Sequence, residues 1–152
     1  MDEIVARSMA KWPNVPAVYG WLSLDRRGSW RIKAERISNA ALREFIARNY
    51  QADERGCWYF QNGPQRVFVE LAYTPLVVHY EDEALLDHCA RPFSSRSFFQ
   101  DDEGSVLVEG ERGIALLDDR DLSRLAERAE SFPRIRRADV ARRYGFVAEP
   151  RP

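Results

Sequence analysis

The chain has 152 residues, of which 45% are hydrophobic, 31% charged and 12% aromatic. This composition excludes a disordered chain. At this length one domain, or two small lobes sharing a core, buries enough apolar surface to fold without disulfides or metal ions. The formal net charge is −1, which excludes an overall positive field of the kind that attracts DNA or an anionic membrane.

The sequence carries no sign of export or of membrane insertion. Its first residues are acidic and lack the apolar run of a signal peptide, and no stretch approaches the roughly 18 apolar residues of a membrane span. The two cysteines, Cys57 and Cys89, are therefore expected to stay reduced. We expect a cytoplasmic protein that does not enter a membrane.

The N-terminal part is predicted to lead from a separate segment, residues 1–16, into a hairpin. Met1–Ala10 fits either two helical turns or a loose tail, and the prolines that follow favour extended backbone. Val18–Leu24 and Ser29–Ala34 are predicted strands around an Asp-Arg-Arg-Gly turn, because Asp starts turns and Gly accepts positive φ. The aromatic face of this hairpin is expected to be buried.

The strongest helical pattern covers Ser38–Tyr50. Ser38 is a favourable N-cap residue, and Leu42, Phe45 and Ile46 recur at the spacing of one helical face. This face is expected to pack against the first sheet.

The densest apolar and aromatic stretch is Cys57–Tyr80, and we expect it to form the interior. Asn62–Pro64 is a turn signal between two predicted strands. The second of these, Arg66–Ala72, alternates with the period of a strand that has one buried face. Thr74-Pro75 breaks the run because Pro donates no ladder hydrogen bond, and a third strand is predicted at Leu76–Tyr80.

Regular patterning is lost between residues 81 and 98, where Glu81–Leu86 favours the start of a helical turn. Further elements are predicted beyond this gap. They are strands at Phe98–Gln100, Ser105–Glu109 and Gly113–Leu117, a helix from Asp118 or Asp119 to Glu130, a helix at Ala138–Tyr144 closed by Gly145, and a disordered tail at Glu149–Pro152.

Together these elements predict an α+β fold of mostly antiparallel hairpins, with one main helix packed on the first sheet and a smaller strand–helix unit after it. We expect a first lobe at residues 17–80 and a second at residues 98–147, sharing one core. Asp25–Asn49 and Asp101–Arg128 repeat the order of Asp-x-x-Gly turn, strand, cap and helix. An internal duplication and a coincidence of turn chemistry both explain this repeat.

The residues suited to metal binding form no established motif. The two cysteines and two histidines, at positions 57, 89, 79 and 88, lack the paired spacing of zinc ligands. The clustered acids at 81–83 and 118–121 fit helix caps and solvated loops better than a cation-binding loop. We predict no metal site, and no cofactor because no nucleotide-binding loop is present.

A small enzyme is one alternative hypothesis. Cys89 directly follows His88, and either His88 or His79 is a candidate partner for its thiol. A reactive thiol needs a lowered pKa, whereas a buried or incidental cysteine has no such need. No nucleophile elbow or similar motif is present, so we assign no catalytic residues.

Nucleic-acid binding is a second alternative, disfavoured by the near-neutral net charge. A base-stacking platform would require exposed aromatic side chains on strands and a positive face beside them. The candidates are Tyr59, Phe68, Tyr73 and Arg66 for the platform, and Arg134, Arg136, Arg137, Arg142 and Arg143 for the positive face.

The hypothesis we favour is a non-enzymatic recognition or regulatory module. Large polar side chains flank the rigid turn at Asn62–Pro64, which is how a scaffold presents a binding loop. A hairpin that simply requires Asn-Gly is the alternative reading. The candidate residues for binding an unknown protein or small molecule are Gln61, Asn62, Gln65, Arg66, Tyr59 and Tyr73. An exposed apolar strand edge would in addition favour a homodimer.

Three segments, Lys11–Pro16 with the Tyr19-Gly20-Trp21 that follows it, Phe45–Tyr50 and Phe60–Val67, give the chain a resemblance to known proteins. It resembles a family of small proteobacterial proteins of unknown function, well over residues 11–80 and loosely over Gly104–Leu125. The resemblance implies a soluble bacterial cytoplasmic protein, and it supplies no activity and no catalytic residues.

Overall fold

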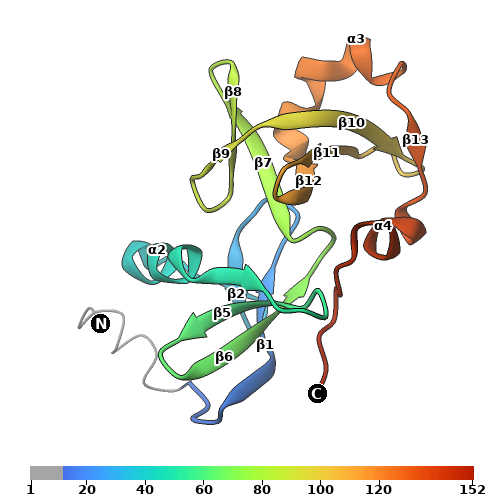
Figure 1. Cartoon of the computed structure of the whole chain (residues 1–152). Helices are drawn as coiled ribbons and strands as arrows, with labels where there is room; N and C mark the ends of the chain where they lie inside the picture. The colour runs from blue at the N-terminus through green and yellow to red at the C-terminus, as the bar shows by residue number, and fades with distance from the viewer. Residues whose placement is uncertain (1–11) are drawn as a thin grey trace. The chain divides into compact units, whose positions relative to one another are not determined.

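The computed structural model describes residues 12–152, and the prediction for Met1–Ala10 lies outside this range. These residues form two compact units (Figure 1). The first unit takes the described residues up to Asp25, then Ser29–Ala72 and Val147–Pro152. The second takes Arg26–Gly28 and Tyr73–Phe146.

The first unit is a six-stranded sheet with one helix. Its strands are β1 (Ala17–Leu24), β2 (Trp30–Ile32), β3 (Glu35–Arg36), β4 (Tyr50–Ala52), β5 (Trp58–Asn62) and β6 (Gln65–Leu71), and its helix is α2 (Ala40–Arg48). The strand order is β3-β2-β1-β6-β5-β4. The β1–β6 pair is parallel and the other neighbours are antiparallel, so the predicted hairpins at 18–34 and 57–72 are confirmed.

Alternation along β5 and β6 decides which side chains meet α2. Phe60 and Val67 are partners in the sheet and are fully buried, and the Phe45 ring of α2 lies 5.3 Å from the Phe60 ring. Ile46 of α2 is also fully buried. Removing each such side chain from water stabilises the fold by about 1.5–3 kcal/mol. The α2 side chains Phe45 and Ile46 therefore lie on the Phe60 side of the sheet.

The cap of this helix differs from the prediction. Asn39, not Ser38, is the N-cap residue, and its side-chain oxygen accepts from the Leu42 N–H at 2.9 Å. Ser and Asn are about equally good caps, and sequence alone does not rank two such neighbours. The helix ends at Arg48 because Tyr50 already begins β4.

A bulge in β1 overturns part of the predicted face pattern of the first hairpin. Val18 pairs with Val67 and Leu22 pairs with Val69, so β1 carries extra residues at this point, and Gly20 there has φ +72°. Such a bulge re-aims the side chains beside it. The buried face is consequently mostly aliphatic, with Val18, Leu22 and Leu24 buried together with Trp30, whereas Tyr19 and Trp21 are only partly buried.

The second unit is built on a seven-stranded sheet in the order β13-β10-β11-β12-β7-β8-β9. Only the β10–β13 and β12–β7 pairs are parallel within it. Its elements are β7 (Leu76–Glu81), β8 (Ala84–Asp87), β9 (Pro92–Phe93), β10 (Ser95–Asp101), β11 (Val106–Gly110), β12 (Gly113–Leu117), the 3-10 helix η1 (Asp119–Leu125), α3 (Ala126–Ala129), β13 (Arg134–Ile135) and α4 (Arg137–Tyr144).

The predicted strands at Phe98–Gln100, Ser105–Glu109 and Gly113–Leu117 are confirmed as parts of β10, β11 and β12. The helix predicted after Asp118 is confirmed in part, and the helical turn predicted at Glu81–Leu86 is wrong. Glu81–Leu86 is the tip of the β7–β8 hairpin and not a helical turn, because Tyr80 pairs with Leu85 and Asp82 takes the positive φ of the tip. The segment after Asp118 starts as η1 and contains only a short α-helix. The last helix ends as predicted, with Gly145 in the left-handed conformation.

The division into units also differs from the predicted lobes at 17–80 and 98–147. Residues 73–81 belong to the second unit because β7 pairs with β12 and β8, so Cys57–Tyr80 is not one continuous sheet. The Thr74-Pro75 break noted in the sequence is where the chain leaves one sheet for the other. Val147–Pro152 return to the first unit, and the predicted disordered tail is in place there.

One turn geometry occurs four times. In each copy an Asp N–H donates to the carbonyl oxygen four residues later, and the Asp Oδ1 accepts from that residue's N–H. The fourth residue has φ between +65° and +84°. The four turns are Asp25–Ser29, Asp53–Cys57, Asp87–Arg91 and Asp101–Ser105. We call them the Asp turns.

Candidate functional site

Three aromatic side chains form a stripe across the first sheet on the face that α2 does not cover. Tyr19 of β1 and Phe68 of β6 are stacked with 4.7 Å between ring centroids and 6° between planes. Phe68 and its sheet partner Tyr59 of β5 are 5.7 Å apart. Alternation produces this stripe, since Tyr59 precedes the inward Phe60 and Phe68 follows the inward Val67. We call Tyr19, Phe68 and Tyr59 the aromatic face.

Two guanidinium groups lie over the aromatic face. The Arg66 guanidinium is 4.5 Å from the Tyr59 ring centroid, and that of Arg55 is 5.9 Å from the Phe68 ring centroid. Arg55 also hydrogen-bonds Tyr19, which raises the pKa of Arg55. Arg66 is exposed and forms no ion pair with any residue in 12–152. The face thus combines apolar area with the exposed guanidinium of Arg66.

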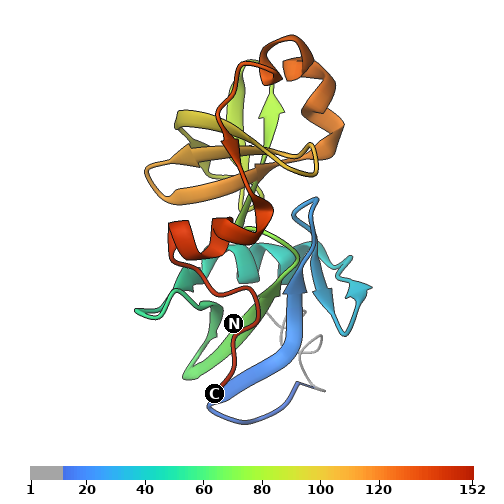
Figure 2. The ribbon, with the colours of Figure 1, turned by 90° about the vertical axis from the view of Figure 1, so that its right-hand side faces the viewer.

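The C-terminal segment, Val147–Pro152, runs along the first sheet on this side (Figures 1 and 2). Main-chain hydrogen bonds hold it: Val147 N–H donates to Gly56 O at 2.9 Å, and Leu71 N–H donates to Ala148 O at 2.8 Å. Val147 forms a parallel bridge with Cys57. These bonds hold Val147 and Ala148 through their backbone groups and not through their side chains.

Side chains of the C-terminal segment add apolar contact. Val147 packs against the cluster of Cys57, Tyr59 and Phe68, and Pro150 is buried. The Arg55 Nη1 donates to the Arg151 carbonyl oxygen at 3.3 Å. Burial raises the pKa of the Cys57 thiol, which is therefore part of the packing and not a nucleophile at neutral pH.

The predicted amide candidates are occupied within the chain. Gln65 is buried, and its Nε2 donates to the carbonyl oxygens of Pro13 and Val15, each at 2.6 Å. Asn62 Nδ2 donates to Gln65 Oε1 at 2.9 Å, and Gln61 Nε2 donates to the Gly63 carbonyl oxygen at 2.6 Å. These three amides tie the turn to itself and to Pro13 and Val15, in the segment that precedes β1.

Gln65 thereby positions Trp12. The Trp12 ring lies 6.1 Å from the Trp21 ring and 6.4 Å from the Phe60 ring, both edge to face. Neither indole N–H has an acceptor among residues 12–152. This contact closes the rim of the core on the α2 side, and it is separate from the aromatic face.

Tyr73 belongs to the second unit and is not part of the aromatic face. Its hydroxyl donates to Asp101 Oδ2 at 2.7 Å, and the guanidinium groups of Arg26 and Arg137 lie 5.2 and 4.7 Å from its ring centroid. Burial and the bond to Asp101 raise the pKa of Tyr73. Tyr73 is a buried structural residue, so the six candidates are not brought together.

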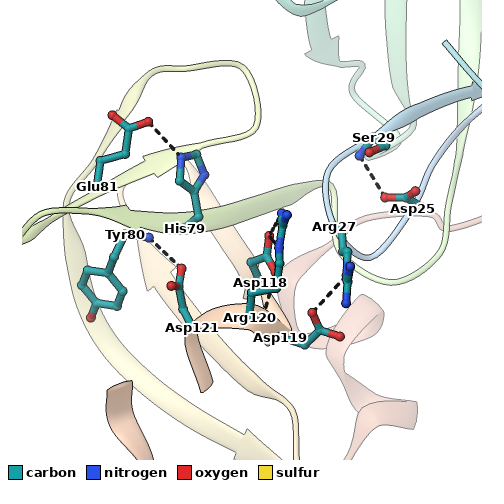
Figure 3. A network of polar contacts seen from close by, with 10 residues as sticks. All are labelled: Asp25, Arg27, Ser29, His79, Tyr80, Glu81, Asp118, Asp119, Arg120 and Asp121. Carbon is teal, nitrogen blue, oxygen red and sulfur yellow. Dashed lines mark hydrogen bonds and ion pairs between the residues drawn. The ribbon is translucent and has the colours of Figure 1, made fainter. Parts of the chain in front are cut away.

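The cysteine and histidine candidates have the wrong protonation for nucleophilic catalysis. Burial raises the pKa of Cys89 to about 12, and burial lowers the pKa of His88 to about 4. At neutral pH this leaves a thiol and a neutral imidazole. His79 pairs with Glu81 at 3.4 Å instead (Figure 3). Within residues 12–152 no group of three or more His, Cys, Asp or Glu side chains is arranged to hold a metal ion.

The clustered acids after β12 form structural contacts (Figure 3). Asp118 caps η1 and binds Arg120 at 2.5 Å, Asp119 pairs with Arg27 at 3.1 Å, and Asp121 accepts from the Tyr80 N–H at 2.9 Å. Each acid therefore has a partner in its own unit.

Three of the five arginines proposed for a positive face around α4 form ion pairs. Arg136 and Arg142 both pair with Asp139, and Arg137 pairs with Glu103 at 3.0 Å. On the aromatic face, Tyr19 and Phe68 turn their ring planes toward each other and not toward solvent. A base-stacking surface needs exposed ring planes, so this geometry does not favour nucleic-acid binding.

Sequence reasoning identified Tyr59 and Arg66 and missed Tyr19, Arg55 and the C-terminal segment as parts of one site. The alternation of the β5–β6 hairpin is the signal that marks Tyr59 and Phe68. No local pattern could have placed Val147 beside Cys57, because that contact joins residues 90 positions apart.

The comparisons with known proteins identify the family. A family model described as "Protein of unknown function (DUF2946)" matches residues 1–151. The chain belongs to this family. No curated protein matches the chain. None of the helices in residues 12–152 is long and apolar enough to cross a membrane.

Two solved structures share the fold of this DUF2946 family member. One is a DUF1285 family protein from Silicibacter pomeroyi, with a TM-score of 0.56, 16% identity and 84% of each chain covered. The other is a DUF1285 family protein from Shewanella baltica, with a TM-score of 0.52, 14% identity, 70% of this chain covered and 90% of that one. At such identities the likeness concerns the fold alone.

Proposed function

We propose that this protein is a non-enzymatic binding module whose aromatic face accepts an extended peptide segment of a partner protein. The observation that carries the proposal is that main-chain hydrogen bonds hold the protein's own Val147 and Ala148 beside Gly56 and Leu71, with the Val147 side chain packed against Tyr59 and Phe68. A surface that holds one extended segment through its backbone has the donors and acceptors to hold another. The proposed place of action is the cytoplasm, where both free thiols stay reduced.

Burial and charge support the same conclusion. Tyr19 is only partly buried and Arg66 is exposed, so part of the aromatic face is open beside the C-terminal segment. Aromatic residues and arginine are the side chains most enriched at the centres of protein interfaces. The strands at the sheet edges, β3, β4, β9 and β13, have two or three residues each, which leaves few main-chain groups for an edge-to-edge homodimer of the kind that an exposed apolar strand edge would favour.

The test uses the full chain and a fluorescein-labelled synthetic peptide of residues 145–152. Val147→Asp in the full chain places a charge at a partly buried position against the apolar cluster and should release the C-terminal segment, because removing a charge from water without a partner is unfavourable. We expect saturable binding of the peptide to this variant by fluorescence anisotropy, and weaker binding when Tyr19→Ala is added.

The matched control is Glu149→Ala, which changes an exposed side chain of the same segment and should not open the site. Far-UV circular dichroism checks that each variant is folded. Absence of peptide binding to a folded Val147→Asp variant would refute the proposed function.

A further inference from the structure

We infer that the partner segment is recognised through the backbone of two adjacent residues, by the N–H of an aliphatic residue and the carbonyl oxygen of the residue after it. This inference rests on the proposed function and specifies the chemistry of the partner. The partner is a peptide with an aliphatic residue whose N–H is free to donate. Proline has no N–H, so it is excluded from the aliphatic position.

The contact lies where the two strands of the β5–β6 hairpin separate. Pairing between β5 and β6 ends at Tyr59 and Phe68, although β6 continues for three more residues. Beyond that pair, Val147 bonds to Gly56 just before β5, and Ala148 bonds to the last residue of β6. The two residues of the C-terminal segment therefore bridge the separated strands through main-chain groups.

The protein's acceptor is fixed by the Asp turn at Asp53–Cys57. Asp53 Oδ1 accepts from the Cys57 N–H at 2.9 Å, and the Gly56 N–H donates to the Asp53 carbonyl oxygen at 3.1 Å. Gly56 has φ +83°, a conformation that glycine adopts without strain. These bonds leave the Gly56 carbonyl oxygen for the Val147 N–H, 2.9 Å away. The acceptor is thus held in place by bonds that do not involve the C-terminal segment.

The protein's donor, the Leu71 N–H, is fixed by the sheet. Leu71 pairs with Leu24 in the parallel β1–β6 ladder, and its N–H donates to Ala148 O at 2.8 Å on the other side. Leu71 is only 6% exposed. A buried N–H without an acceptor costs free energy. When the C-terminal segment leaves, a carbonyl oxygen of another segment is therefore favoured at the same place.

The aliphatic preference comes from the residue that supplies the N–H. Val147 packs against the buried cluster of Cys57, Tyr59 and Phe68. The same position of a partner must therefore carry an apolar side chain. The backbone bends at Ala148 and at the residue after it, so the extended contact ends with the Ala148 carbonyl.

The experiment uses the labelled peptide of residues 145–152 and the full chain carrying Val147→Asp. Ester analogues of the peptide replace one backbone N–H by oxygen and keep every side chain. The ester at the valine removes the donor to Gly56 and should weaken binding about three- to tenfold, as expected for the loss of one hydrogen bond. The control is the ester at the arginine, since the Arg151 N–H makes no hydrogen bond within residues 12–152. This control should bind within about twofold of the parent peptide.

The outcomes separate this inference from the proposed function. If the valine ester binds as tightly as the parent peptide, the main-chain recognition is wrong while the proposed function stands. If no peptide binds to the folded chain, both are wrong.

A second variant, Val147→Pro, tests the same N–H within the chain and adds no charge. It removes the donor to Gly56, so the parent peptide should bind this chain about three- to tenfold more tightly than it binds wild type. The matched control is Glu149→Ala, an exposed change that should leave binding within about twofold of wild type. Equal binding by Val147→Pro and wild type would show that this N–H does not hold the segment, and would overturn the inference.

Discussion

The two histidines of the chain, His79 and His88, occupy opposite environments. His79 is partly exposed on β7 and pairs with Glu81. His88 is partly buried in the second unit, where its Nε2 atom is buried and its Nδ1 accepts from the Val77 N–H at 3.2 Å. Burial is the main cause that lowers the pKa of His88 to about 4, and the nearby Asp87 carboxylate opposes the shift only in part. The buried imidazole is therefore neutral near pH 7.

This difference predicts a loss of stability in mild acid. An unfolded histidine has a pKa near 6.5, so between about pH 6.5 and pH 4 the unfolded chain binds a proton at His88 that the folded chain does not. Stability from this residue is present above pH 6.5 and falls as the pH drops toward 4, by about 3 kcal/mol in total. Urea denaturation of the wild type at a series of pH values measures it.

His88→Asn is the variant that tests the assignment, because its side-chain oxygen can still accept from the Val77 N–H without titrating. The slope of unfolding free energy between pH 6.5 and pH 4 should be shallower in this variant than in wild type, and unchanged in His79→Asn. An equal slope in His88→Asn and wild type would show that another group causes the acid sensitivity.

At the scale of residues, the sequence was informative where a side chain's role follows from its neighbours in the chain. Alternation placed Tyr59 and Val67 on opposite faces. Alternation could not show that the Gln65 amide would donate to the carbonyl oxygens of Pro13 and Val15, because this contact depends on which segment lies beside β6. A polar side chain beside a turn is compatible with recognition and with internal bonding, and only the tertiary partner decides.

Among the elements, the Asp turns show how local chemistry fixes a loop. Three of the four have Gly at the fourth position, where φ is between +81° and +84°. The fourth turn, Asp87–Arg91, has Ala90 there with φ +65°. A non-glycine residue in this region costs roughly 1 kcal/mol because its Cβ approaches the backbone.

Ala90→Gly is therefore expected to stabilise the protein by up to about 1 kcal/mol, since relief of strain outweighs the greater freedom of glycine in the unfolded chain. The reverse exchange in an equivalent turn, Gly104→Ala, should destabilise it by a similar amount. A Cβ at Gly104 would meet no atom within 4 Å, so the strain there is purely conformational. The urea-denaturation midpoint measures both effects. It should rise for Ala90→Gly and fall for Gly104→Ala.

The sequence predicted the elements whose stability is local. The hairpins at 18–34 and 57–72 and the end of α4 at Gly145 follow from turn and cap residues that act within a few positions. The β7–β8 hairpin was missed because Glu81–Leu86 has no strand alternation, and its pairing with β7 overrides a weak helical preference. The start of α2 was missed by one residue for a similar reason, since two capping residues stand side by side.

For the whole molecule, the path of the chain couples the two units. The first unit is assembled from segments on both sides of Tyr73–Phe146, so unfolding of the second unit leaves Ala72 and Val147 joined only by a long flexible loop. Closing such a loop costs conformational entropy, and this cost is absent while the second unit is folded. All four tryptophans, at positions 12, 21, 30 and 58, lie in the first unit and report on it alone.

Leu107→Ala tests this coupling. Leu107 is fully buried in the second unit, and its truncation should destabilise that unit by about 2–5 kcal/mol. If the units unfold together, the urea midpoint followed by tryptophan fluorescence shifts with the midpoint followed by circular dichroism. Arg96→Ala, an exposed change on β10, should shift neither. A fluorescence midpoint unaffected by Leu107→Ala would mean that the units unfold independently.

The self-contained bonding of the Asp turns leaves their two middle positions uncommitted. Several of these positions carry side chains that fasten distant parts of the same unit, as Arg27 does with Asp119, Arg55 with the Arg151 carbonyl, and Glu103 with Arg137. The conformation of such a loop is set by its aspartate and glycine. The side chains at its two middle positions can therefore be exchanged without changing the strands. New long-distance connections can therefore accumulate during evolution at little risk to the hairpins that display them.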